Sequence, residues 1–195
     1  MIKDSTPEKW EYREHTRVKH EILGKYLHPW IVKLGSVYPK VLFIDGFAGK
    51  GEYKDEITGK IEPKGSPVIA LKVANRLLEQ AEEKKRNPCF DEFVCICIEK
   101  NKDNFNNLKN VINKEKEKLK FKDKLQVDII NDEFANVVNE IYNSVGARIA
   151  PSFFFIDPFG FSGVPFEIIK KTFIFTKNRN IFYIYDKLYR QVFII

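Results

Sequence analysis

One stretch near the start of the chain joins a short apolar run, an acid and two glycines, and it constrains the fold most. It reads Val41-Leu-Phe-Ile-Asp-Gly-Phe-Ala-Gly-Lys-Gly-Glu-Tyr53. An apolar run of this length before a glycine cluster is typical of a buried parallel strand that turns sharply at its carboxyl end. Glycine lets a backbone pass close to a ligand, so Gly49 and Gly51 predict a ligand-facing loop after a strand at 41–45.

Strand and helix patterns alternate through the rest of the chain. Further strands are predicted at 93–98, 125–130, 152–156 and 180–185. Helices are predicted at 8–34, from Ser66 onward, at 105–119, at 133–144 and at 165–173. This alternation predicts right-handed crossovers and an open, doubly wound, mostly parallel α/β sheet with helices on both faces, a Rossmann-like fold. In such sheets, ligands bind beyond the carboxyl ends of the strands, where the strand order switches.

The chain is expected to form a helical segment at 1–40 followed by a Rossmann-like domain at 41–195. Apolar side chains recur at helical spacing in the first segment, at Val18, Ile22, Tyr26 and Leu27. We expect Pro29 to break or restart that helix, because proline lacks a backbone N–H. Ser66 is expected to cap the free N–H groups of the next helix.

Composition argues against a membrane protein. Hydrophobic residues make up 44% of the 195 and charged residues 31%. The longest apolar stretches, such as 153–156, are far shorter than the ~20 residues of a membrane span. The first residues lead into a charged segment rather than an apolar one, so no signal peptide is predicted and a cytoplasmic location is expected.

The three cysteines predict neither a metal site nor a disulfide framework. Cys95 and Cys97 lie within the predicted strand 93–98, so their thiols are expected to pack as small apolar groups. Zinc sites use paired ligands at other spacings, and no histidine follows position 28.

The net charge of +6 leaves two interpretations open. Nine lysines and four acids lie between Lys100 and Lys124. Such a basic segment suits a polyanionic partner such as nucleic acid. It is equally typical of a solvated helix face.

A polar residue follows each of the first four predicted strands directly. These residues are Asp45, Glu99, the run Asn131-Asp132-Glu133 and the run Asp157-Pro158-Phe159-Gly160. Parallel strands bring such residues to one edge of the sheet, which predicts a binding site there. The alternative is helix capping, which fits Asp132 well and Asp157 poorly.

Three of these strand ends suit the parts of an adenosyl cofactor. Gly49 and Gly51 allow close approach of its amino-acid end, and Asp45 is placed to hold the ammonium group. Glu99 stands where an acid binds the ribose hydroxyls in dinucleotide folds. Asp132 is then placed to accept a hydrogen bond from the adenine amino group.

Nucleotide-binding motifs fit this loop less well. A phosphate loop needs Gly-x-x-x-x-Gly-Lys-Ser/Thr, and Gly46-Phe-Ala-Gly-Lys-Gly lacks the hydroxyl residue. The dinucleotide fingerprint Gly-x-Gly-x-x-Gly is also absent, since this loop has Gly-x-x-Gly-x-Gly. An acid four residues before the glycine pair suits a cationic sulfonium, so the loop predicts S-adenosyl-L-methionine as cofactor.

The fourth strand end concerns the acceptor of the methyl group. Methylation of a base amino group needs hydrogen-bond acceptors for its N–H and an aromatic ring on which the extruded base stacks. Asp157 and the Pro158 carbonyl are candidate acceptors, and Phe159 or Phe161 is the candidate ring. The alternative is a strand-ending turn with core phenylalanines, since aromatic side chains are usually buried.

With these motifs in view, the chain resembles the three-Cys-motif partner family of bacterial and archaeal proteins. The shared features are a Lys-His helix, Asp-Gly-Phe-Ala-Gly-x-Gly, Gly-Ser-Pro and Asp-Pro-Phe-Gly, from about Lys19 to Phe166. The resemblance implies a methyltransferase-like protein that works with a separate partner protein. The family name refers to that partner, so the cysteines of this chain are not its motif.

The chain is more distantly similar to the adenine-N6 methyltransferases of large-subunit ribosomal RNA. Their Leu-Lys-His, Asp-x-His-Ala-Gly-x-Gly-x-Tyr, Gly-Ser-Pro-Leu-Ile-Ala and Asp-Pro-Pro-Tyr motifs correspond to 18–20, 45–53, 65–70 and 157–158. This resemblance implies a catalytic Asp157. It also implies cofactor contacts within the segment that includes Gly46 and at His20, Phe47, Ser66, Glu99 and Asp132.

Two departures from that second family stand out. Phe159-Gly160 replaces Pro-Tyr, which displaces the stacking ring. Class I methyltransferases usually have seven strands, and the chain ends near its fifth, so we expect a truncated sheet. A fragment, a frameshifted product or an edge covered by a partner are the alternatives, since an uncovered apolar edge invites association.

The sequence therefore favours an S-adenosylmethionine-dependent methyltransferase that acts on a base amino group in RNA or DNA. The alternative is a non-catalytic protein that binds the adenosyl cofactor and works with a partner protein.

Overall fold

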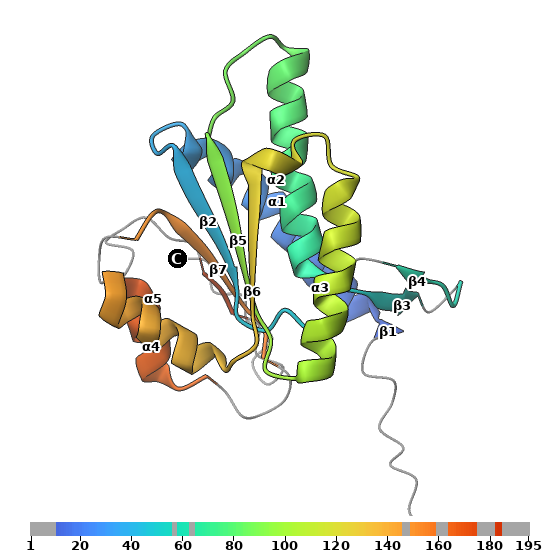
Figure 1. Cartoon of the computed structure of the whole chain (residues 1–195), viewed down its shortest axis with the longest axis vertical. Coiled ribbons are helices and arrows are strands. Elements are labelled where there is room, and N and C mark those ends of the chain that lie inside the picture. The colour runs from blue at the N-terminus through green and yellow to red at the C-terminus, as the bar shows by residue number, and fades with distance from the viewer. Residues whose placement is uncertain are drawn as a thin grey trace, which may run out of the picture.

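A five-stranded parallel sheet forms the centre of the computed structural model, which describes residues 11–55, 58–62, 65–145, 149–158, 164–174 and 182–184 (Figure 1). Its strands are β2 (Lys40–Asp45), β5 (Glu92–Ile98), β6 (Leu125–Ile130), β7 (Ser152–Ile156) and β8 (Phe182–Ile184). Every pairing within this sheet is parallel. The predicted doubly wound α/β sheet is confirmed.

The strand order β6-β5-β2-β7-β8 places the earliest of these strands in the middle. The chain builds outward from β2 through β5 to β6, and then crosses back to form β7 and β8 on the other side. The order therefore switches between β2 and β7, which is where doubly wound sheets bind their ligands.

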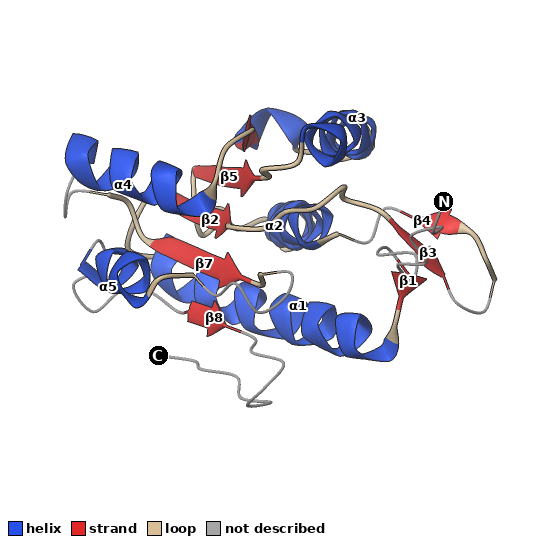
Figure 2. Cartoon of the chain, turned by 90° about the horizontal axis from the view of Figure 1, so that it is seen from below, coloured by secondary structure: helices blue, strands red, loops and turns tan. Residues whose placement is uncertain are grey.

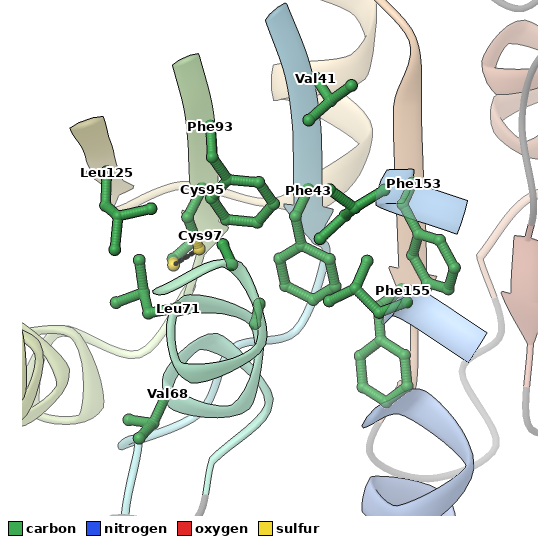
Figure 3. Close-up of a cluster of buried hydrophobic side chains, with 14 of the residues drawn as sticks. Val41, Phe43, Val68, Leu71, Phe93, Cys95, Cys97, Leu125, Phe153 and Phe155 are labelled. Carbon is green, nitrogen blue, oxygen red and sulfur yellow. Dashed lines mark hydrogen bonds between the residues drawn. The ribbon is translucent and has the colours of Figure 1, made fainter. Parts of the chain in front are cut away.

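Helices cover both faces of the sheet (Figure 2). One face carries α1 (Glu14–Gly35), α2 (Ser66–Glu83) and α3 (Lys102–Glu117), and the other carries α4 (Phe134–Val145) and α5 (Phe166–Ile174). Because strand side chains alternate between faces, Phe43 and Phe153 pack toward α1 and α2, whereas Ile44 and Phe154 pack toward α4 and α5. Figure 3 shows the first cluster, in which the Phe43 and Phe153 rings stack with centroids 5.9 Å apart.

The buried face of α1 matches the predicted apolar residues only in part, since Leu27 is fully buried and Ile22 packs against the core. Val18 and Tyr26 are 44% and 42% exposed. The buried stripe instead comprises Thr16, Lys19, His20, Leu23, Leu27, Trp30 and Ile31. Helix α1 thus has two apolar stripes, and the one with the larger leucine and tryptophan side chains buries more apolar surface against the sheet. The first turns of α1 also bury three polar side chains, those of Thr16, Lys19 and His20.

Pro29 neither breaks nor restarts α1, which continues through it to Gly35. Proline removes one helical hydrogen bond, and that loss alone favours a break. Trp30 and Ile31, the next two residues, are almost fully buried in the core. Their packing holds the second half of the helix in line, since tertiary contacts supply most helical stability in proteins.

A second, smaller sheet includes two strands from the segment between the strand predicted at 41–45 and the helix predicted from Ser66. It pairs β1 (Glu11–Tyr12), β3 (Tyr53–Asp55) and β4 (Ile61–Glu62) in the order β1-β3-β4. Strands β3 and β4 form a hairpin, and β1 joins β3 in parallel. A partner about 40 residues away in sequence completes this sheet, and so short-range patterns did not reveal it.

Candidate functional site

The carboxyl ends of β2, β5 and β7 bring three acids to the switch in strand order. Asp45 is the last residue of β2, and it stands opposite Cys97 of β5 and Phe155 of β7. Glu99 and Asp157 each follow two residues beyond those partners. Neighbouring strands lie only ~4.8 Å apart, so the register brings the three acids to the same edge of the sheet.

Asp45 is completely buried, and both of its carboxylate oxygens have partners within the chain. The Phe47 N–H donates to Oδ1 at 3.0 Å, and the Ser66 hydroxyl donates to Oδ2. Burial raises the pKa of Asp45 to about 7. The two hydrogen bonds lower that pKa, and the charges of Asp157 and Glu99 raise it. Asp45 therefore anchors the following loop and titrates near neutrality.

Ser66 does not cap α2, contrary to the prediction from sequence. Gly65 is the N-cap residue, no side chain caps the helix, and Ser66 is its first residue. Its hydroxyl instead donates to Asp45, because a buried carboxylate is costly without a hydrogen-bond donor. The site thus links β2 directly to the start of α2.

The two glycines of the loop both have backbone conformations that disfavour other residues. Gly49 has φ 63° and Gly51 has φ 79°. A Cβ on Gly51 would lie 2.8 Å from the side chain of Leu108 in α3. A Cβ on Gly65 would come within 2.8 Å of the Gly51 backbone, which also accepts a hydrogen bond from the Gly65 N–H. The loop backbone therefore packs directly against the backbone at the start of α2 and against side chains of α3.

Asp157 forms an ion pair with Lys19 of α1. The ammonium Nζ bonds Oδ2 of the carboxylate, and the two side chains are only 10% and 21% exposed. Lysine is seldom buried without a partner. The buried stripe of α1 thus brings a cation to the residue predicted to be catalytic.

His20 lies next to this pair, within a cluster of aromatic rings from the small sheet. Its ring centroid is 5.5 Å from those of Tyr12 and Tyr53. Burial, together with the charge of Lys19, lowers the pKa of His20 to about 3, so the ring is neutral at physiological pH. Its Nδ1 is buried and has no hydrogen-bond partner among the residues that the structure describes.

Glu99 is buried at the end of β5, and its carboxylate accepts a hydrogen bond from the Asn101 N–H at 2.7 Å. Asn101 in turn caps α3 with its side chain. The side chain of Asn131 donates to the Glu99 carbonyl at 2.8 Å, which ties the loop after β6 to the loop after β5. The carboxylate of Glu99 is thus held by a backbone N–H, and its carbonyl is held by the Asn131 side chain.

The hydrogen-bond partners of Asp132 are close neighbours in the sequence. Its Oδ1 accepts from the Glu133 N–H at 2.6 Å and from the Asn136 side chain at 2.8 Å. Hydrogen bonds from Asn136 and from that backbone N–H lower the pKa of Asp132. These contacts at the start of α4 match the capping alternative, although they leave Oδ2 to a ligand.

The remaining predicted residues divide into three groups. Gly46 packs so closely against Phe134 that a Cβ would lie 2.8 Å from its ring, and Phe47 lies beside the same ring with centroids 5.7 Å apart. Pro158 follows Asp157 and is partly buried. Phe159 and the alternative ring Phe161 lie outside the described residues.

The sequence did not single out Lys19, Tyr12 or Tyr53 as site residues. Burial raises the pKa of the Tyr53 hydroxyl, and the charges of Asp157 and Asp45 add to the effect. For Lys19, the available signal was its place directly before His20 in the Lys-His pair. For Tyr12, no local signal existed, because its position depends on the pairing of β1 with β3.

The remaining observations concern the cysteines, possible metal ligands and possible membrane-spanning helices. Cys95 and Cys97 are fully buried, as predicted, and their sulfur atoms lie 3.5 Å apart. Within the described ranges, no three His, Cys, Asp or Glu side chains gather to hold a metal ion. The helices in the same ranges include none long and apolar enough to cross a membrane.

Comparisons with known proteins do not assign the chain to a family. No protein-family model and no curated protein matches the chain. One similar solved structure is a Legionella pneumophila protein of family DUF519, with 12% identity and a TM-score of 0.48. The similarity covers 83% of this chain and 67% of that one. The resemblance to the three-Cys-motif partner family thus remains a resemblance.

Proposed function

We propose that this chain is an S-adenosylmethionine-dependent methyltransferase that acts on a base amino group of RNA or DNA. One observation carries the proposal. Three acids, Asp45, Glu99 and Asp157, lie at the switch in strand order. The charges of Glu99 and Asp157 raise the pKa of Asp45. Doubly wound sheets bind ligands at this place, and clustered acids with a perturbed pKa are typical of functional sites.

The residues present fit an adenosyl cofactor. Asp45 and the loop of Gly49 and Gly51 would hold its amino-acid end, while Glu99 would hold the ribose hydroxyls. Asp132 has Oδ2 for the adenine amino group. The buried Nδ1 of His20 is a further hydrogen-bonding atom without a partner among the described residues. When bound, the cofactor supplies an electrophilic methyl group on a sulfonium centre.

Asp157 is the proposed acceptor of a hydrogen bond from the substrate amino group. Lys19 bonds Oδ2, so Oδ1 would be the oxygen that accepts from the substrate. The carbonyl of Pro158 supplies a second acceptor. Two acceptors that bind the N–H hydrogens would orient the amino group so that its nitrogen lone pair points at the methyl group, and positioning of this kind provides much of enzymatic catalysis.

The basic segment 100–124 supports a nucleic-acid substrate only in part. Four of its nine lysines pair with acids, namely Lys100, Lys118, Lys120 and Lys122. Their partners reduce the charge available to phosphates. The net charge of +6 still favours association with a polyanion.

A second candidate function is cofactor binding without catalysis, in concert with a partner protein. The Lys19–Asp157 ion pair favours it, because a cation neutralises the carboxylate that would otherwise receive the substrate. Under this alternative, Lys19→Met leaves cofactor affinity unchanged and produces no methyl transfer. Under the first proposal, the same variant changes the transfer rate.

Transfer of a tritiated methyl group from S-adenosylmethionine tests the proposal. Total RNA, total DNA and total protein are offered separately, and the label incorporated in each is counted. We expect label in RNA or DNA. Label in protein alone would reject the nucleic-acid substrate, and cofactor binding without any transfer would favour the second candidate.

A further inference from the structure

The loops after β5 and β6 are joined by a side chain that the proposed function does not use. Asn131 is the first residue beyond β6, and its side-chain amide donates to two carbonyls of the other loop. These are the carbonyls of Glu99, at 2.8 Å, and of Lys100, at 3.0 Å. An amide NH₂ group has two donors, whereas a hydroxyl has one and a carboxylate has none. Asparagine is therefore suited to fix one loop against the other at this position.

The main chain of Glu99 is held between the end of β6 and the residue that follows it. Its N–H donates to the Ile130 carbonyl at 3.0 Å, and its own carbonyl accepts from Asn131. The carboxylate accepts from the Asn101 N–H through Oε1, and no residue within the described ranges donates to Oε2. A buried carboxylate oxygen without a donor is costly. The contacts of Glu99 thus leave Oε2 to a ligand.

Asn131 also connects the acid proposed for the ribose with the acid proposed for the adenine. Asp132 is the next residue, and its Oδ1 is held by Glu133 and Asn136 at the start of α4. The amide of Asn131 therefore ties the loop that carries Glu99 to the loop that carries Asp132. Binding groups need such supporting hydrogen bonds, because a displacement of about 1 Å is enough to lose most of a directed contact.

We infer that Asn131 is a positioning residue for recognition of the cofactor ribose, and that it acts through Glu99. The role rests on the proposed function, because it takes the adenosyl cofactor as the ligand. Without the two hydrogen bonds from Asn131, the loop at 99–101 loses its side-chain tie to the loop after β6. The carboxylate of Glu99 then leaves the position from which Oε2 reaches the ribose hydroxyls, and selectivity for ribose falls.

The preference for ribose over deoxyribose tests this role with the full chain. S-adenosylhomocysteine and its 2′-deoxy analogue are titrated by calorimetry into the wild type, Asn131→Asp, Asn131→Ala and Glu99→Gln. The aspartate variant keeps the shape of the side chain without its donors, and the alanine variant adds no charge. We expect the wild type to prefer the ribose compound at least about tenfold and the variants less than about threefold, since a hydrogen bond to a charged group contributes a factor of this size.

Two further proteins separate positioning from general stability. Asn113→Asp is the matched control, because Asn113 is exposed on α3 and undergoes the same change of charge. It should keep the wild-type preference. The double variant Asn131→Ala with Glu99→Gln should bind S-adenosylhomocysteine about as weakly as Glu99→Gln alone, because residues that act through one contact have non-additive effects.

Several results would overturn the role of Asn131 and leave the adenosyl site intact. One is a ribose preference that persists in Asn131→Asp and Asn131→Ala, or an equal weakening of both compounds, which would assign Asn131 to loop stability alone. Another is additive losses in the double variant, which would show that Asn131 does not act through Glu99. Equal affinity of the wild type for the two compounds would remove Glu99, and with it Asn131, from ribose recognition. Failure of the wild type to bind either compound would reject the proposed function as well.

Discussion

The acids at the switch in strand order and the acid after β6 occupy equivalent places in sequence, yet their surroundings differ. Asp45 and Asp157 bond residues 21 and 138 positions away, Ser66 and Lys19. Asp132 bonds its own neighbours, Glu133 and Asn136. Asp45 and Asp157 are thus held by distant elements that enclose them, whereas Asp132 is held chiefly by the helix that follows it.

The comparison is tested most strongly at Asp157. Asp157→Ala removes the proposed acceptor, so methyl transfer should fall by about 10²–10⁴-fold, a typical contribution of a positioned catalytic group. Cofactor binding should persist, because Asp157 is assigned to the substrate. Tritiated-methyl transfer and calorimetry measure the two quantities separately.

Asp128→Ala is the matched control, since Asp128 lies on β6 with an exposed side chain outside the site. It should leave transfer at the wild-type rate. Wild-type activity in Asp157→Ala would remove this residue from the mechanism.

Asp45→Asn should weaken S-adenosylmethionine binding by about 10–100-fold, since a hydrogen bond to a charged group contributes roughly 1.5–3 kcal/mol. In the wild type, affinity should rise with pH through about 7 as Asp45 loses its proton. The asparagine variant should lack this pH dependence. Calorimetry between pH 6 and 8 measures both effects, and an unchanged pH profile in the variant would contradict the assignment.

The same pKa predicts how folding stability changes with pH. Folded Asp45 keeps its proton up to about pH 7, whereas the carboxyl of an unfolded chain releases it near 3.8. The free energy of unfolding of the wild type should therefore fall, relative to Asp45→Asn, as pH rises between these values. Urea unfolding at several pH values should show a difference on the order of 4 kcal/mol across the window. Parallel curves for the two proteins would refute the buried, protonated state.

A smaller effect is expected at Glu99. Glu99→Gln keeps an acceptor for the Asn101 N–H but loses the charge offered to the ribose hydroxyls. Cofactor affinity should drop about tenfold, as for the loss of a charge-assisted hydrogen bond. Glu92→Gln, at the other end of the same strand, is the control and should not change it.

The smallest effect is expected at Asp132. Asp132→Asn retains an acceptor for its local hydrogen bonds, and an exposed charge contributes little, so affinity should change by less than about threefold. A loss as large as that of Asp45→Asn would show that the two regions are equivalent after all.

Much of the fold could be predicted from the sequence because its determinants are local. The apolar runs of β2, β5, β6 and β7 have bounds within one residue of the predicted ones. Their order along the chain, with helices between them, left few topologies open. The acids directly after them could be located for the same reason.

Features that depend on long-range contacts could not be predicted in this way. The orientation of α1 depends on which of two apolar stripes packs on the sheet, and Val18 and Leu23 are both apolar. The Lys19–Asp157 pair and the role of Ser66 arise only when α1, α2 and β7 meet. The periodicity of apolar residues within one segment carries no information about contacts between distant segments.

Calorimetric titration with S-adenosylmethionine, S-adenosylhomocysteine and ATP tests the central claim most directly. The account predicts that both adenosyl compounds bind at a single site, that ATP does not compete, and that Asp45→Asn weakens both. Failure of both adenosyl compounds to bind the folded wild-type chain would contradict the claim, as would a preference for ATP.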